Sequence, residues 1–142
     1  MACPYFHAVS PRNQTDHSRS AMLPLGDAWD GVCLAPAASP APPDEVTLLT
    51  RCNMGYARGC CPRFPADDGP DAARFTISSD SAETLRLYYV LERDHLPWAH
   101  GPLEYSRKSD TFAAPSASES TLQLARAYVA SYLRRISEAS RH

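Results

Sequence analysis

All five cysteines of this 142-residue chain lie within its first 61 residues, at Cys3, Cys33, Cys52, Cys60 and Cys61. Cysteines that serve only as small apolar residues are expected in the strands and helices of a core, throughout the chain. An odd number also excludes complete disulfide pairing within one chain. The distribution therefore predicts a cysteine site built by the first half of the sequence.

The chain has little material for an apolar core. Its 44% hydrophobic residues include 21 alanines and five cysteines, and its 13 prolines exclude regular helix or interior strand from much of the sequence. The length suits a single domain. Because apolar burial alone supports so thin a core poorly, we expect a bound metal to contribute to folding.

Charge and hydropathy exclude several classes of protein. Fourteen Lys and Arg residues against 16 Asp and Glu residues give a formal net charge of −2, whereas proteins that bind nucleic acid or anionic membranes usually carry a basic excess. No apolar run approaches the roughly 18 residues of a membrane span. The first residues show no basic segment followed by an apolar one, so we expect no secretory signal and a cytoplasmic location. In that compartment, clustered cysteines more often bind metal or carry out redox chemistry than form disulfides.

The first half of the chain is predicted to be mostly loop. Residues 1–35 hold short apolar clusters without a sustained period, and residues 35–43 form a proline-rich link that should be extended. A proline and two acids at residues 43–45 indicate the start of a short helix that Gly55 can end. Cys52 then lies at the end of this helix, and the last two cysteines lie in the loop beyond it.

The second half has clearer patterns. Residues 74–78 and 85–91 are rich in strand-forming side chains and flank a polar turn at residues 79–83, which predicts an antiparallel hairpin. Residues 101–106 could supply a third strand after a turn at residues 97–101.

The final segment has the periodicity of an amphipathic helix. Ser116 and Glu119 fit a capping box, and apolar residues recur at helical spacing over residues 122–136. We therefore predict a single α+β domain with a loop-rich cysteine region at 1–65, antiparallel strands at 71–106 and a C-terminal helix at 116–138.

The cysteine spacing does not match the paired CxxC knuckles of zinc ribbons or the compact run of bacterial ferredoxins. Four separate positions remain: Cys3, Cys33, Cys52 and one of the adjacent Cys60 and Cys61. Neighbouring side chains on extended backbone point to opposite faces, so we expect only one of the last two to be a ligand. A proline follows Cys61, which favours Cys61.

Two features favour an iron–sulfur cluster at these cysteines. Both Cys3 and Cys61 precede proline, as does the last cysteine of the ferredoxin run. Gly55 and Gly59 would let backbone N–H groups approach sulfur. Five aromatic residues could shield such a cluster from water: Tyr5, Phe6, Trp29, Tyr56 and Phe64. Structural zinc requires the same four thiolates and remains the alternative cofactor.

Three histidines are further candidates. His7 is close enough in sequence to Cys3 to be a mixed-site ligand, and His95 and His100 could form a metal-binding or proton-handling pair. The simpler interpretation of the last two is that they are polar residues on a turn between strands.

Three cysteine-bearing segments carry a family resemblance. Residues 3–6 (CPYF), 23–33 (LPLGDAWDGVC) and 52–57 (CNMGYA) resemble a group of uncharacterised small bacterial multi-cysteine proteins with metal or iron–sulfur sites. The resemblance implies a multi-cysteine site and brings no established activity with it.

The sequence therefore predicts a small iron–sulfur protein without catalytic residues of its own. A [4Fe–4S] cluster held by Cys3, Cys33, Cys52 and Cys61 would transfer electrons or sense redox state. The chain would act with a protein redox partner or as a subunit of a larger redox complex. The alternative is a zinc-stapled interaction module with no redox role. A third hypothesis is a thiol enzyme that uses Cys60 and Cys61, but the sequence lacks the CxxC motif that is usual in such enzymes.

Overall fold

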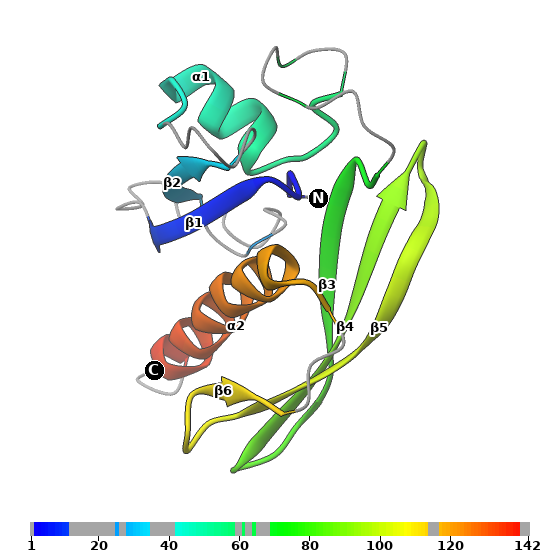
Figure 1. Ribbon diagram of the computed structural model, residues 1–142. Coiled ribbons are helices and arrows are strands. Elements are labelled where there is room, and N and C mark those ends of the chain that lie inside the picture. The colour runs from blue at the N-terminus through cyan, green and yellow to red at the C-terminus, as the bar shows by residue number, and fades with distance from the viewer. Residues whose placement is uncertain are drawn as a thin grey trace.

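The computed structural model describes residues 2–11, 25, 28–34, 42–58, 61, 64, 69–113 and 117–139. These residues form two antiparallel sheets and a long C-terminal helix (Figure 1), so the predicted α+β class is confirmed. None of the described helices is long and apolar enough to cross a membrane. The predicted proline-rich link falls outside the described residues, except for Pro42 and Pro43.

The smaller sheet pairs β1 (Phe6–Pro11) with β2 (Trp29–Cys33). The prediction of loop over residues 1–35 is wrong here. Only Phe6 and Ala8 of β1 are buried, and Val9 is 62% exposed, so the alternation is too short to be recognised in the sequence. The pairing with a distant segment stabilises these strands, and a single sequence does not reveal that pairing.

The predicted short helix is confirmed, with an unusual ending. A turn of α-helix, α1 (Glu45–Thr47), continues as a π-helical turn, η2 (Leu48–Cys52). The Asp44 side chain caps its start by accepting from the Thr47 N–H at 3.2 Å. Gly55 follows its end with a φ of 81°, a conformation that suits glycine.

The larger sheet is a four-stranded meander of β3 (Ala72–Asp80), β4 (Thr84–Arg93), β5 (Leu96–Ser106) and the short β6 (Thr111–Phe112). The predicted hairpin and third strand are confirmed. The predicted turn at residues 97–101 is wrong, because the chain reverses at Asp94 and His95 and β5 continues through that segment. Proline is tolerated there because β6 pairs only with Tyr105 and Ser106, which leaves this part of β5 at a sheet edge.

The final helix, α2 (Glu119–Ala139), lies between the two sheets (Figure 1). Its first turn is capped by Ser118, whose hydroxyl accepts from the Thr121 N–H at 3.3 Å, and Ser116 of the predicted capping box lies outside the described residues. On one side, the Trp29 indole N–H donates to the Ser131 hydroxyl at 3.2 Å. On the other side, the rings of Phe75 and Tyr128 stack at 5.7 Å. The helix is therefore buried on two faces, whereas the sequence indicated a single sheet-facing stripe.

Candidate metal centre

Backbone pairing brings four cysteine-bearing segments together. The Cys3 N–H donates to the Cys52 carbonyl at 3.0 Å, which joins the residues before β1 to the end of η2. Cys33 ends β2 directly opposite Phe6 in β1. The Cys61 N–H donates to the Ala57 carbonyl at 2.8 Å and turns the chain back towards η2.

The four predicted ligands line one small cavity of about 20 Å³, which we call the cysteine pocket. All four are free thiols; Cys3 and Cys52 are buried, and Cys33 and Cys61 are partly exposed. The rest of the described lining is mainly apolar and consists of Tyr5, Phe6, Arg51, Ala57 and Phe64. Cys60 lies outside the described residues, so the choice between Cys60 and Cys61 stays a prediction.

The two buried thiols strongly favour their neutral forms. Burial raises the pKa of Cys3 to about 12, and the charges of the other three cysteines also raise this pKa. A hydrogen bond from the Tyr5 backbone N–H lowers the pKa of Cys3, but by less than burial raises it. Burial, followed by the charges of Cys33 and Cys61, also raises the pKa of Cys52 to about 12. These mutual effects show that the four sulfur atoms are electrostatic neighbours. A bound cation reverses this balance because it stabilises thiolates directly.

The four thiols of the pocket are the donor type that holds zinc or an iron–sulfur cluster, but their spacing does not fit a single metal ion. Four thiolates around one zinc ion at about 2.3 Å would lie within about 3.8 Å of one another. Among the described residues, no group of three His, Cys, Asp or Glu side chains is placed to hold a metal ion. A four-iron cluster is held at its corners by thiolates that are further apart than those around a single ion.

The size of the cavity sets a condition on this fit. A volume of about 20 Å³ holds roughly one water molecule. A cluster could enter only if thiol side chains turned outward. Cys33 and Cys61 have the room to do so, because both are only partly buried.

Aromatic side chains close one side of the pocket. Tyr5 and Phe64 meet edge to face at 5.3 Å, and the Arg58 guanidinium lies 4.7 Å from the centre of the Phe64 ring. Of the five aromatic residues that the sequence proposed as a shield, Trp29 and Tyr56 are directed elsewhere. Trp29 bonds to α2, and Tyr56 donates to Glu92 at 2.6 Å.

Three residues outside the predicted set help to build this site. Arg51 and Ala57 line the pocket, and Asn53 connects η2 to β2 through bonds to both backbone groups of Trp29. Arg51 and Asn53 flank Cys52, which is the only signal that could have singled them out.

The histidines do not join the cysteine pocket. His7 is paired with Val32 and faces a different cavity. His95 stacks on Tyr56 at 4.2 Å, and His100 bonds through Nδ1 to the Tyr88 hydroxyl. His95 lies on the turn, as the simpler interpretation expected, whereas His100 lies within β5.

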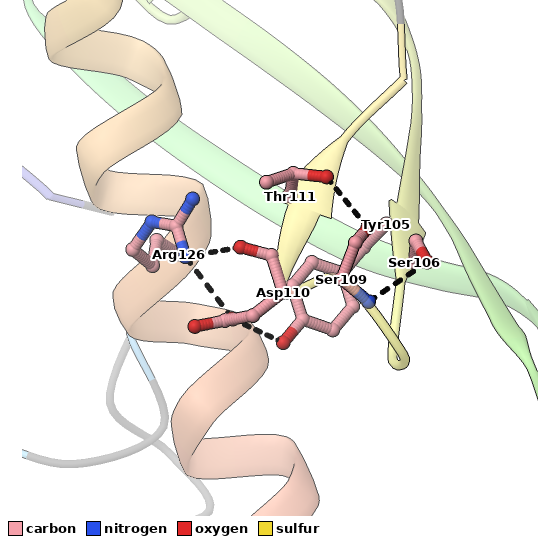
Figure 2. A network of polar contacts seen from close by, with 6 residues as sticks. All are labelled: Tyr105, Ser106, Ser109, Asp110, Thr111 and Arg126. Carbon is pink, nitrogen blue, oxygen red and sulfur yellow. Dashed lines mark hydrogen bonds and ion pairs between the residues drawn. The ribbon is translucent and has the colours of Figure 1, made fainter.

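The second cavity is a larger cleft of about 640 Å³ beside the start of α2, with residues of β1, β6 and α2 and Leu34 in its walls. Figure 2 shows part of this wall, where Arg126 of α2 reaches the carbonyl and the carboxylate of Asp110 at 3.0 and 3.1 Å. The Tyr105 hydroxyl donates to the same carboxylate. This network attaches the β5–β6 hairpin to α2.

Comparisons with protein-family models, curated proteins and solved structures found no match to this chain. The relation to small bacterial multi-cysteine proteins therefore stays a prediction, and the function has to be argued from the site.

Proposed function

We propose that this chain is a small iron–sulfur protein whose cysteine pocket holds a [4Fe–4S] cluster for electron transfer or redox sensing. The observation that carries the proposal is the convergence of Cys3, Cys33, Cys52 and Cys61 on one pocket. They come from four segments that are separated by up to 58 residues of sequence (61 − 3). Side chains that served only as packing would have no reason to be four thiols gathered in one place.

The surroundings of the pocket support a cluster. The Tyr5 N–H bonds to the Cys3 sulfur, and bonds of this kind stabilise and tune the reduced cluster. Arg51 brings a positive charge to a site where thiolates and a reduced cluster are negative. Apolar walls keep water away from the sulfur atoms of the buried Cys3 and Cys52.

The pocket suits exchange of single electrons with a protein partner. Its described lining holds no carboxylate or imidazole that could act as a general acid or base. Cys33 and Cys61 are partly exposed, which places one side of the site near the surface. A partner docked there would donate or accept one electron per encounter. A cytoplasmic location, where thiols stay reduced, belongs to the same proposal.

Anaerobic purification with absorption spectroscopy and iron, sulfide and zinc analysis tests this function. We expect a brown protein with broad absorption near ~400 nm and about four iron atoms per chain. The Cys33→Ser variant should lose the cluster, and the matched Val32→Thr variant, changed at the neighbouring position of β2, should keep it. A colourless protein with about one zinc per chain would instead identify the zinc-stapled module.

The adjacent cysteines allow a second test of the same site. Cys61→Ser should lose the cluster and Cys60→Ser should keep most of it, because Cys61 lines the pocket and we expect only one of the two adjacent cysteines to be a ligand. Equal iron content in the two variants would show that Cys61 is not the fourth ligand.

A further inference from the structure

Three residues other than glycine with left-handed backbone meet at one corner of the molecule. Tyr56 has a φ of 59°, and Asp94 and His95, the two residues of the β4–β5 turn, have φ values of 51° and 64°. The rings of Tyr56 and His95 stack at 4.2 Å with an angle of 12° between their planes. Tyr56, which follows η2, therefore lies directly against the β4–β5 turn.

Asp71 joins this loop to the turn. One oxygen of its buried carboxylate accepts from Arg58 Nε at 2.5 Å, and the other accepts from the Asp94 N–H at 2.9 Å. Its carbonyl accepts from the Tyr56 N–H at 3.1 Å. We refer to Tyr56, Arg58 and Asp71 together as the clasp.

The clasp is continuous with the wall of the cysteine pocket. Ala57, which lines the pocket, stands between Tyr56 and Arg58 and accepts the Cys61 N–H. Arg58 also packs on Phe64, another lining residue, whose N–H donates to the Cys61 carbonyl at 3.1 Å. A shift of Phe64 thus acts on Arg58 directly, and a shift of Cys61 acts on it through Ala57 and Phe64.

The β4–β5 turn depends on the clasp for its conformation. Two-residue hairpin turns with positive φ at both positions favour Asn-Gly or Asp-Gly, and here the second residue is His95. A side chain in this conformation is strained and persists when surrounding contacts hold it. Those contacts are the Tyr56 ring and the Asp71 carboxylate. The turn is therefore an element that can relax when the clasp loosens.

We propose that occupancy of the cysteine pocket controls the order of the β4–β5 turn through the clasp. This inference rests on the proposed iron–sulfur function. For a cluster that senses redox state, the coupling would transmit the change from the cysteine pocket to the protein surface. A group bound to Cys61 positions Ala57 and Phe64, to which Cys61 is hydrogen-bonded. Arg58 then holds Asp71, and Asp71 with Tyr56 holds the turn. Leu96 and Trp98, which follow the turn and are 67% and 48% exposed, would report the state of the pocket to the exterior.

Hydrogen exchange followed by mass spectrometry tests the coupling on the full chain. The metal-free protein is compared with protein loaded anaerobically with ferrous iron and sulfide, and bound iron is measured on the same samples. We expect amide exchange over residues 93–96 to slow about tenfold on loading, while residues 84–90 in the body of β4 change little. Bound iron with unchanged exchange at residues 93–96 would overturn the coupling alone, and absence of bound metal would overturn the proposed function and the coupling with it.

Three variants separate the clasp from general stability. Arg58→Gln should bind iron but lose the exchange difference at the turn. His95→Gly relieves the strain, so the turn should be equally protected with and without iron. Arg86→Gln is the matched control, because Arg86 pairs with Glu104 at 3.8 Å and neither residue bonds to the clasp, so this variant should keep the full difference. A full difference in both Arg58→Gln and His95→Gly would also overturn the proposal.

Discussion

Asn53 connects two of the segments around the cysteine pocket. Its side chain is 1% exposed, and its amide accepts from the Trp29 N–H at 2.9 Å and donates to the Trp29 carbonyl at 3.1 Å. The same amide donates to the Leu48 carbonyl at 2.9 Å. One side chain thus fixes the start of β2 against η2, which carry Cys33 and Cys52.

We predict that Asn53→Ala destabilises the protein by about 2–4 kcal/mol, because it removes the amide that bonds to the buried N–H and carbonyl of Trp29. Chemical denaturation measures the loss. The control is Ser10→Ala, at an exposed position of β1, which should change stability by less than about 0.5 kcal/mol. A similarly small effect of Asn53→Ala would show that water replaces the amide.

Tyr105 gives the fold a dependence on alkaline pH. Burial, the hydrogen bond to Asp110 and the charge of that carboxylate raise the pKa of Tyr105 to about 12 (Figure 2). A tyrosine in the unfolded chain ionises near pH 10. Stability is therefore fully present below about pH 10 and is lost as the pH rises towards 12.

The Tyr105→Phe variant should lack this part of the alkaline loss. We expect it to cost about 1 kcal/mol at pH 7 through the missing hydrogen bond. Between pH 10 and 12 its unfolding free energy should then fall by about 2 kcal/mol less than that of the original protein. Parallel pH profiles of the two proteins would contradict the assignment, since other tyrosines contribute equally to both.

At the scale of elements, the β1–β2 pair depends on a close backbone approach at Gly31. A Cβ atom there would lie 2.0 Å from the His7 carbonyl oxygen and 2.9 Å from the Phe6 ring. Contacts this short involve backbone, so the strands would have to separate. Cys33 lies two residues further along β2, so the cysteine pocket shares this requirement.

Gly31→Ala should therefore destabilise the protein by about 3 kcal/mol and lower its iron content. Gly69→Ala is the matched control, because its added Cβ would meet only the Tyr5 hydroxyl, at the ordinary distance of 3.7 Å. Denaturation and metal analysis of the two variants provide the comparison. Iron content at the original level in Gly31→Ala would show that β2 does not position Cys33.

Local pattern explains which elements could be predicted. The β3–β4 hairpin and α2 repeat their patterns over many residues, and the Asp44 cap with Gly55 delimits the short helix. The strands β1, β2 and β6 have at most six residues each and owe their existence to pairing with other segments. The turn was misplaced because Pro97 and Gly101 are usual turn residues, whereas Asp94 and His95 take positive φ values through the clasp.

At the scale of the whole molecule, the same contacts position the cysteine pocket and stabilise the fold. Cysteine positions could be proposed from the sequence, because thiols confined to half a chain form a compositional signal. The arginines beside them could not be, since Arg51 and Arg58 have no pattern of their own and acquire roles only through folding. The packing of α2 on β1 as well as on β3 was likewise invisible, and it couples the cysteine-bearing half to the C-terminal helix.

This coupling determines which segments should lose protection from hydrogen exchange when the metal is removed. Ligands from four segments close long loops at once, so metal binding contributes directly to the folding free energy of the first half. The β3–β4–β5 meander pairs its strands over most of their length and depends on the site least. The helix α2 is intermediate, because one side bonds to Ala8 and Trp29 and the other packs on the meander.

We therefore predict a graded response to anaerobic chelation of the metal, measured by hydrogen exchange. Exchange should rise most in residues 2–11, 28–34 and 42–58, less in α2, and least in residues 84–91 and 99–106. Within α2, amides near Gln123 and Ser131, which bond to the smaller sheet, share their helical turns with residues that pack on the meander, so the helix should respond as one unit. Equal protection of residues 2–58 with and without metal would mean that the fold stands without it, and the apolar core, thin as it is, would then be sufficient.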